Sequence, residues 1–260
     1  MDEQQVDAYL ARIGAQRPAR PDPAALRTLQ RAHLTAVPFE NLSVTLGEPI
    51  ELTERALWAK LVERRRGGFC YELNGAFAAL LRALGYHVEL LSARVFDGDR
   101  PGPPFDHLAL RVESDGPWLV DVGFGRFSHG PLRLDTDAAQ SDPGGEFTVT
   151  AHGDDLDVAM DGRPQYRLDR RPYRLADFTP TCWWQATSPA SHFTRSTTCS
   201  RLTADGRITL AGTRLIRTAP DGSRTERELT GGEALDAYHD LFGIALERLP
   251  VGAPPPPARH

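Results

Sequence analysis

Three features are absent from this chain of 260 residues, and each absence excludes a class of protein. No window of about 18 apolar residues occurs, so we expect no membrane-spanning helix. The start of the chain, MDEQQVDAYLARIG, is acidic and amphipathic, which is unlike a signal peptide. The net charge is −5 and the longest basic run covers only residues 64–66, so we expect no nucleic-acid partner.

Cysteine is also scarce, which bears on redox state and on metal binding. The three cysteines, Cys70, Cys182 and Cys199, cannot all pair with one another, and no secretion signal precedes them. We therefore expect reduced thiols and a cytoplasmic location. Their spacing matches no zinc-binding pattern, so we expect no bound metal.

Hydrophobic residues make up 40% of the sequence, enough for a buried core, and their spacing changes along the chain. In the first third the spacing predicts four helices, near residues 6–13, 22–34, 52–65 and 70–85, with a loop at 36–50. Asp22 followed by Pro23 is a candidate helix start, as is Thr53, and Gly85 is a candidate stop.

From residue 86 the period changes to two, which predicts strands. We expect these at 86–95, 106–112, 117–124, 146–152, 156–160 and 165–168. A loop with three prolines follows at 169–190, then a strand meander over 191–230, a helix at 231–242 and a short tail with prolines at 254–257. The order of helices, strands and a mixed end predicts an α+β fold rather than a doubly wound sheet.

Cys70 stands in the segment RRRGGFCYELNGAF, at the expected start of a helix. The positive end of the helix dipole and the unpaired N–H groups there favour the thiolate, which is the nucleophilic form of cysteine. Gly67 and Gly68 would let a substrate approach the backbone, and the N–H groups could hold an oxyanion. The alternative is that Cys70 is a small core residue that happens to start a helix.

The segment FDHLALRVESDGPWLVDVGFG contains a candidate base and a candidate carboxylate. The apolar residues of 106–112 and 117–124 can face one core in only one register, with Val112 opposite Trp118, Leu110 opposite Val120 and Leu108 opposite Val122. That register makes 114–116 a three-residue hairpin loop. It also makes His107 and Asp121 diagonal neighbours on the other face, within reach of each other.

Together, Cys70, His107 and Asp121 would form a complete thiol–imidazole–carboxylate set. Asp121 would orient the imidazole, and His107 would take and return the proton. The alternatives are a surface histidine and a solvated strand carboxylate. The two glycines of DVGFG indicate that something passes close to the end of this strand, although no helix follows that would make a phosphate site.

These segments resemble those of the arylamine N-acetyltransferases. RRRGGFCYELNGAFAALLRALGYHVELLSARV, HLTAVPFENLSV upstream and LVDVGFG downstream are similar to that family's motifs, and the resemblance runs from about residue 6 to the last helix. It implies a helical bundle at 1–85 that carries the nucleophile, a central antiparallel β-barrel at 86–190 that carries the histidine and aspartate, and a C-terminal α/β lid at 191–260. The fold implied by the resemblance is cysteine-protease-like.

The resemblance also implies roles for particular residues. Cys70 would accept the acyl group, and His107 and Asp121 would complete the triad. The acceptor pocket would be lined by Phe39, Phe124 and Phe193, with plain core packing as the alternative. The active-site loop would be braced by an ion pair of Glu40 and Arg66, next to Gly67 and Gly68. Cys182 and Cys199 match no family role, so we interpret them as packing residues.

The implied reaction is a ping-pong acetyl transfer, of the kind used in xenobiotic metabolism. Acetyl-CoA, a co-substrate rather than a permanently bound cofactor, would acetylate Cys70. An arylamine, hydrazine or N-hydroxyarylamine would then attack the thioester, with His107 as base. The amine must be unprotonated, which favours weakly basic aromatic amines at neutral pH.

One departure from the family pattern leaves room for a different function. Asp106 precedes the histidine where the family often has threonine, near the channel for the CoA thiol, and a carboxylate there would repel phosphates and weaken CoA binding. A related amide synthase could instead close a macrolactam from a chain delivered by an acyl carrier protein. A cysteine hydrolase would share the chain order Cys, His, Asp, and a non-enzymatic binding module would keep the thiol only as a relic.

Overall fold

The computed structural model describes residues 1–250 and 252, so the expected proline tail at 254–257 lies outside the described residues. Its helical segments are α1 (Glu3–Ile13), α2 (Pro23–Ala36), α3 (Leu42–Leu46), α4 (Glu54–Trp58), η1 (Ala59–Glu63), α5 (Cys70–Ala83), η2 (Leu175–Phe178), α6 (Thr179–Thr187), α7 (His192–Arg195) and α8 (Gly231–Phe242). Its strands are β1 (Phe39–Glu40), β2 (His87–Asp97), β3 (Arg100–Pro101), β4 (His107–Glu113), β5 (Pro117–Val120), β6 (Leu132–Arg133), β7 (Gln140–Asp142), β8 (Gly145–His152), β9 (Asp155–Met160), β10 (Arg163–Tyr173), β11 (Thr198–Thr203), β12 (Gly206–Ala211), β13 (Arg214–Thr218) and β14 (Arg224–Glu228).

The four helices expected in the first third are present, and local chemistry sets their ends. The Asp22 carboxylate accepts from the Ala25 N–H at 2.9 Å at the start of α2, directly before Pro23. Thr53 caps α4, which continues as the π-helical segment η1. Gly85, with a φ of 92°, lies in the left-handed region directly after α5 and its cap residue.

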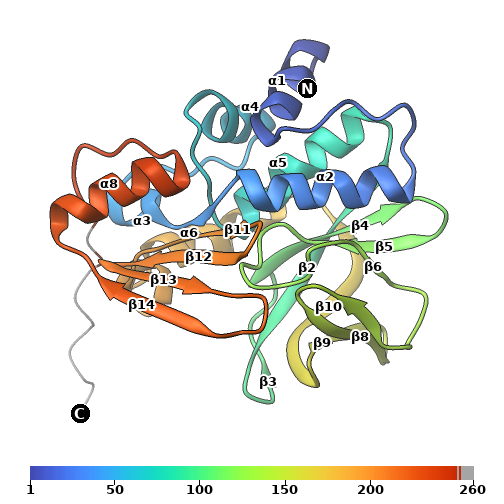
Figure 1. Ribbon diagram of the computed structural model, residues 1–260. Helices are drawn as coiled ribbons and strands as arrows, with labels where there is room; N and C mark the ends of the chain where they lie inside the picture. The colour runs from blue at the N-terminus through green and yellow to red at the C-terminus, as the bar shows by residue number, and fades with distance from the viewer. Residues whose placement is uncertain (251, 253–260) are drawn as a thin grey trace.

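Eight antiparallel strands form a strongly curved sheet in the order β6-β5-β4-β2-β10-β9-β8-β7, seen at the lower right of Figure 1. The two edge strands are joined by one side chain. Gln140 of β7 accepts from the Arg133 N–H of β6 at 2.6 Å and donates to the Arg133 carbonyl at 3.0 Å. The sheet therefore closes almost completely into a barrel.

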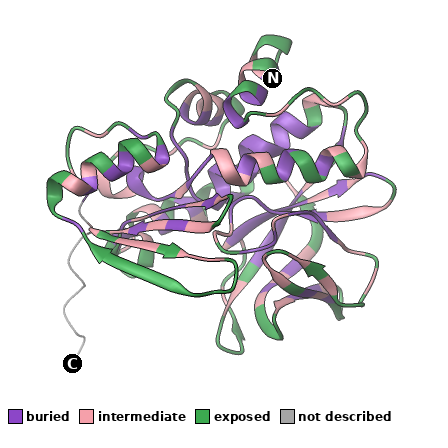
Figure 2. Ribbon diagram, viewed as in Figure 1, coloured by how far each residue is buried: buried purple, intermediate pink, exposed green. Residues whose placement is uncertain are grey.

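Strands β2 and β4 are buried on both faces because helices cover one face and the barrel interior covers the other. Leu90 and Leu110 pack with α1, α2 and α5, whereas Leu91 and Ala109 point into the barrel. Figure 2 shows α5 as buried along most of its length. The face of β4 that carries His107 is thus the barrel interior, not a solvent-facing surface.

The register predicted for the β4–β5 hairpin is confirmed over the length of β5. Leu110 pairs with Val120 and Val112 with Trp118, and residues 114–116 form the loop. The expected strand at 117–124 is too long, however, because β5 ends at Val120. The N–H groups of Val122 and Gly123 are bonded to side chains, the first to Asn74 and the second to Asp121, both at 2.9 Å, and so cannot continue a ladder. The predicted pairing of Leu108 with Val122 is therefore absent.

A second sheet, in the order β1-β11-β12-β13-β14, is covered by α8 at the left of Figure 1. The meander β11–β14 and the last helix agree with the sequence prediction. Cys199 of β11 packs in the core between this sheet and α8, and Cys182 of α6 packs with the N-terminal helices. Both cysteines are therefore packing residues, as interpreted.

Three segments were predicted wrongly. The expected loop at 36–50 contains β1 and α3, and the first part of the meander expected at 191–230 is the short helix α7. The expected loop at 169–190 contains the end of β10, η2 and α6. Its prolines do not exclude a helix there because Pro180 lies in the first turn of α6, where no N–H is needed.

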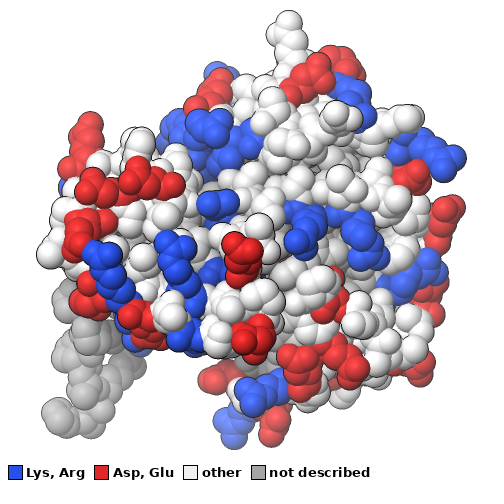
Figure 3. Space-filling model, viewed as in Figure 1, with Lys and Arg blue, Asp and Glu red and all other residues white. Residues whose placement is uncertain are grey.

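The α+β class is confirmed, with helices first, a nearly closed antiparallel barrel next and an α/β part last. The division at residues 85 and 190 stays a prediction. No helix among the described residues is both long enough and apolar enough to cross a bilayer. On the face that Figure 3 shows, basic and acidic side chains are interspersed rather than gathered into one extended basic surface.

Candidate active site

Cys70 is the first residue of α5, as the sequence predicts. Phe69 precedes it as the N-cap, and the Phe69 N–H donates to the Glu72 carboxylate at 3.2 Å. That N–H is therefore not available to an oxyanion. Helix α5 runs through the main core, so the thiol is carried by a buried and well-supported element.

The structure brings Cys70, His107 and Asp121 together. The Asp121 Oδ2 atom lies 2.7 Å from Nε2 of His107, and both side chains are buried. Cys70 and His107 line the same cavity, and the imidazole is close enough to the thiol to lower its pKa against the effect of burial. Because Nε2 is used by the carboxylate, Nδ1 is the ring nitrogen left for the sulfur.

Four donors surround the Asp121 carboxylate, which is only 1% exposed. Oδ1 accepts from Asn74 Nδ2 and from the Gly123 N–H, both at 2.9 Å. Oδ2 accepts from His107 and from the Tyr166 hydroxyl at 3.2 Å. A buried carboxylate with every lone pair used is held in one orientation, and so is the imidazole bonded to it.

Sequence reasoning missed Asn74, although the chain contains a signal for it. Asn74 follows Cys70 by one helical turn, on a helix whose other inward residues are mostly apolar. Its amide donates to the Leu108 carbonyl at 2.6 Å and accepts from the Val122 N–H at 2.9 Å. It thereby joins the helix of the thiol to the segments of the histidine and aspartate.

The charges of the groups around His107 favour its protonated form. Burial opposes the imidazolium, but the charge and hydrogen bond of Asp121 outweigh this and raise the pKa of His107 to about 10. Burial raises the pKa of the Cys70 thiol, while the charge and hydrogen bond of His107 oppose that rise. The helix start alone is therefore not enough for a thiolate, which depends on the neighbouring imidazolium.

A cavity of about 660 Å³ opens beside the thiol. Its walls include all three aromatic residues expected in the acceptor pocket, Phe39, Phe124 and Phe193, together with Cys70 and His107. The Phe124 ring centroid lies 5.0 Å from that of His107, and the Phe193 ring lies 6.3 Å from Phe39. The arrangement suits a flat aromatic molecule next to the sulfur.

Gly67 and Gly68 were expected to let a substrate approach the backbone, but the structure gives them a packing role. A Cβ on Gly67 would lie 1.9 Å from the Pro38 carbonyl oxygen, and one on Gly68 would lie 2.6 Å from the Glu72 carboxylate. The room they leave is thus filled by the chain itself rather than by substrate. Similarly, Gly123 packs on the start of α5, where a Cβ would lie 2.7 Å from the Cys70 Cα.

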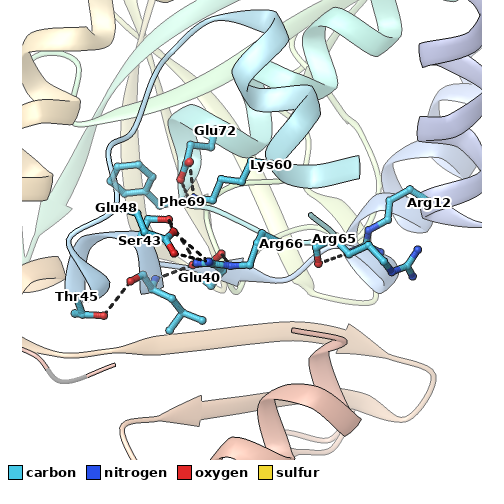
Figure 4. Close-up of polar contacts among 11 residues, drawn as sticks. Arg12, Glu40, Ser43, Thr45, Glu48, Lys60, Arg65, Arg66, Phe69 and Glu72 are labelled. Carbon is cyan, nitrogen blue, oxygen red and sulfur yellow. Dashed lines mark hydrogen bonds and ion pairs between the residues drawn. The ribbon is translucent and has the colours of Figure 1, made fainter. Parts of the chain in front are cut away.

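A buried polar network lies next to the first turn of α5 (Figure 4). Arg66 binds Glu40 through its Nε at 3.0 Å and Glu48 through Nη1 at 3.1 Å. Glu40 also accepts from the Leu42 N–H at 2.7 Å. Although burial opposes it, the positive charges of Lys60 and Arg66 lower the pKa of Glu40. The expected Glu40–Arg66 pair is thus present and is extended by Glu48.

The same figure shows a second buried pair, Lys60 and Glu72, at 2.6 Å. Lys60 is the single lysine of the chain. Burial raises the pKa of Glu72, and the charge of Lys60 opposes that rise. Because Glu72 also accepts from the Phe69 N–H, this pair supports the turn that presents Cys70.

A second cavity, of about 330 Å³, lies between residues 125–144 and the second sheet. It shares the wall residues Phe39 and Thr198 with the first cavity. Arg126 and Arg207 line it, and among the described residues neither has a carboxylate within ion-pair distance. Burial, with the nearby charge of Arg126, lowers the pKa of Arg207 to about 10. An anion would supply the missing negative charge.

Comparison with known proteins agrees with this geometry. A family described as N-acetyltransferase matches residues 22–251. An arylamine N-acetyltransferase from Mycolicibacterium smegmatis is 38% identical over 250 residues, which cover 92% of this chain and 91% of that relative. This chain belongs to the arylamine N-acetyltransferase family.

Two further relatives of this arylamine N-acetyltransferase family are similar along most of the chain. One from Salmonella typhimurium, an arylamine N-acetyltransferase / N-hydroxyarylamine O-acetyltransferase, is 37% identical and covers 81% of this chain and 78% of its own. The structure of Mycobacterium marinum arylamine N-acetyltransferase in complex with CoA is 33% identical, with a TM-score of 0.84 and 92% of each chain covered.

Among the residues that the structure describes, no cluster of three or more His, Cys, Asp or Glu side chains could hold a metal ion.

Sequence reasoning missed Tyr166 as well as Asn74, and it missed Glu48 and the basic cavity. Tyr166 carries no local signal, because it reaches Asp121 from a strand 45 residues further along the chain.

We expect replacement of Lys60 by methionine to destabilise the fold by about 3–5 kcal/mol, because it leaves the Glu72 carboxylate buried without its partner. The double variant Lys60→Met, Glu72→Leu should recover most of this loss. Urea unfolding at pH 7 measures both. A double variant as unstable as the single one would show that the pair is not the cause.

Proposed function

We propose that this chain is an arylamine N-acetyltransferase that moves an acetyl group from acetyl-CoA to the nitrogen of an arylamine through a thioester on Cys70. The observation that supports this best is the arrangement of Cys70, His107 and Asp121 at the wall of a cavity lined by aromatic side chains. Asp121 serves as the positioning residue, since it touches the imidazole and not the substrate.

In the first half-reaction the Cys70 sulfur attacks the carbonyl carbon of acetyl-CoA. The His107 imidazolium lies beside the sulfur and stabilises the thiolate before attack. The carbon–sulfur bond to CoA then breaks, and His107 protonates the departing CoA sulfur. Acetyl transfer between two thiols costs little free energy, which suits a cysteine nucleophile.

In the second half-reaction an unprotonated amine attacks the acetyl-Cys70 carbonyl. His107, now neutral, takes the proton from the attacking nitrogen as the new carbon–nitrogen bond forms. The carbon–sulfur bond to Cys70 breaks, and the thiolate–imidazolium pair is restored. The hydrogen bond from Asp121 keeps the ring oriented for both transfers.

The basic cavity supports acetyl-CoA as the donor. Arg126 and Arg207 lie where phosphate groups could neutralise them, next to the wall residues shared with the catalytic cavity. Asp106 lines the catalytic cavity and not the basic one, so its expected repulsion of CoA phosphates stays a prediction.

Acceptors in this proposal are arylamines and hydrazines, and also N-hydroxyarylamines, which appear in the name of the Salmonella relative. The family relationship favours acetyl-CoA over an acyl carrier protein, so the amide synthase is retained only as an outcome of the first test below. The cytoplasmic location also stays a prediction.

Incubation with acetyl-CoA alone should add the mass of one acetyl group to the protein, and Cys70→Ala should abolish the addition without unfolding the chain. Intact-mass spectrometry and circular dichroism measure the two effects. Acetylation of the Cys70→Ala variant would rule out the proposed nucleophile. Rapid loss of the acetyl group to water would favour a hydrolase, and reaction only with a carrier-bound thioester would favour the amide synthase.

Asp121→Asn should lower the rate of Cys70 acetylation on the order of 10³-fold while leaving the fold intact. Asp121 raises the folded-state pKa of His107 from 6.5 to about 10, so this pair stabilises the folded chain fully below pH 6.5 and loses its effect as the pH rises towards 10. In the variant this pH dependence of stability should disappear. A near-normal rate would remove the positioning role of Asp121.

Arg207→Gln should raise the KM for acetyl-CoA by roughly 10-fold or more, because one charged hydrogen bond to phosphate is lost. Turnover with p-nitrophenyl acetate, a donor without phosphates, should change less than about twofold. The melting temperature should change little, because Arg207 is half-buried, has no carboxylate partner among the described residues and donates only to the Ser200 hydroxyl, at 3.1 Å. Equal effects on both donors would contradict a phosphate-binding role.

A further inference from the structure

Four ionisable side chains of the cavity beside Cys70 have no part in the mechanism above: Asp97, Asp106, His192 and Arg195. Asp106 directly precedes His107 and lines the cavity together with Cys70 and Phe193. Burial raises the pKa of its carboxyl, so the surroundings are poorly hydrated. The half-buried carboxylate of Asp106 is therefore exposed to any substrate that enters the cavity.

The Asp106 carboxylate is fixed in position. Its Oδ1 accepts from Gln185 Nε2 at 2.8 Å, and Gln185 in turn accepts from the Ser191 hydroxyl at 2.7 Å. The backbone is fixed too, since the Tyr71 hydroxyl donates to the Asp106 carbonyl at 3.1 Å. The preceding residue, Phe105, has a φ of 63°, a backbone conformation that costs free energy and that its surroundings must enforce. The side chain therefore has little freedom to turn away from an incoming molecule.

Little positive charge opposes this carboxylate inside the cavity. The charge of His107 is matched by Asp121 at 2.7 Å. His192 is exposed, and partial desolvation lowers its pKa from the usual histidine value, which favours the neutral ring at pH 7. Arg195 lines the cavity and donates to the Ser191 carbonyl, but among the described residues no cation lies within ion-pair distance of Asp106.

The remaining charged group of the cavity wall is Asp97, which adds negative charge but is exposed. Water screens an exposed charge strongly, whereas aromatic walls around Asp106 screen it weakly. Arg195 is exposed too, so water screens its charge in the same way. Among the unpaired charges of the cavity wall, that of the half-buried Asp106 is therefore the least screened.

We propose that Asp106 selects acceptors by charge, so that this enzyme acetylates neutral or cationic arylamines and hydrazines and discriminates against those that carry a carboxylate. The inference rests on the proposed function, since it concerns the second half-reaction. When the amine nitrogen reaches the thioester on Cys70, the rest of the acceptor occupies the cavity that Asp106 lines. A carboxylate on the acceptor then meets a fixed like charge in a medium of low dielectric constant.

The test uses two acceptors of nearly the same shape, para-aminobenzoate, which is anionic, and para-aminobenzamide, which is neutral. In a ping-pong mechanism kcat/KM for the acceptor reports only the second half-reaction, so any effect of Asp106 on acetyl-CoA does not enter. The wild type should prefer the amide. Asp106→Asn should raise kcat/KM for the anionic acceptor by about tenfold and change that for the amide less than about twofold.

Two controls separate charge from position. Asp106→Asn keeps an oxygen that can accept from Gln185, and Asp106→Ser, which is also neutral, should shift the ratio between the acceptors in the same direction. Asp97→Asn removes an exposed carboxylate from the same wall and should leave the ratio within about twofold of the wild type.

An unchanged ratio in both Asp106 variants would overturn the proposal, and so would equal changes for the two acceptors, which would indicate a positioning role. A wild-type enzyme that takes up acetyl on Cys70 but prefers the anionic acceptor would overturn this inference and leave the proposed function standing. A wild type that acetylates neither acceptor would overturn both.

Discussion

The burial of one carboxylate, Asp121, organises the centre of this structure. An ionised group that is 1% exposed needs a donor for each lone pair, and the chain supplies donors from a helix, two strands and the loop after Asp121 itself. Helices and barrel are therefore joined at one point, next to the thiol. The same requirement ends β5 early, because the N–H groups after Asp121 are drawn to side chains instead of a neighbouring strand.

Buried charges near the start of α5 are likewise matched, here by ion pairs. Arg66 is shared by Glu40 and Glu48, and Lys60 is matched by Glu72, so each buried charge has an opposite one in contact. These ion pairs support one side of the turn before Cys70. Aromatic packing supports it as well, with the Phe193 ring centroid 5.4 Å from that of Phe69. In the basic cavity, by contrast, the half-buried Arg207 and the exposed Arg126 have no carboxylate partner among the described residues, which leaves their charges available to an anionic ligand.

Much of the fold and of the candidate site could be predicted because the decisive signals are local. Caps at Asp22 and Thr53 and the alternation along β4 and β5 all act within a few residues, and the register of that hairpin alone brought His107 to Asp121. Other features depend on distant partners. The room beside Gly67 and Gly68 was assigned to substrate because nothing nearby reveals that Pro38 and Glu72 fill it. Helix α6 was missed because a proline in a first turn looks the same in sequence as one in a loop.

The barrel has a seam. Most neighbouring strands share ladders of several backbone hydrogen bonds, but β6 and β7 are held together by the two hydrogen bonds of the Gln140 side chain. Local opening is easier where strands share few backbone hydrogen bonds, so amide hydrogen exchange at this edge is expected to be faster than in the continuous ladders of the barrel. Ring contacts lead inward from the neighbouring loop, from Phe127 to Phe124 and on to the imidazole of His107. Local opening of the β6–β7 edge would thus be transmitted to the imidazole of His107 through these ring contacts. It would not involve α5, the helix that carries Cys70.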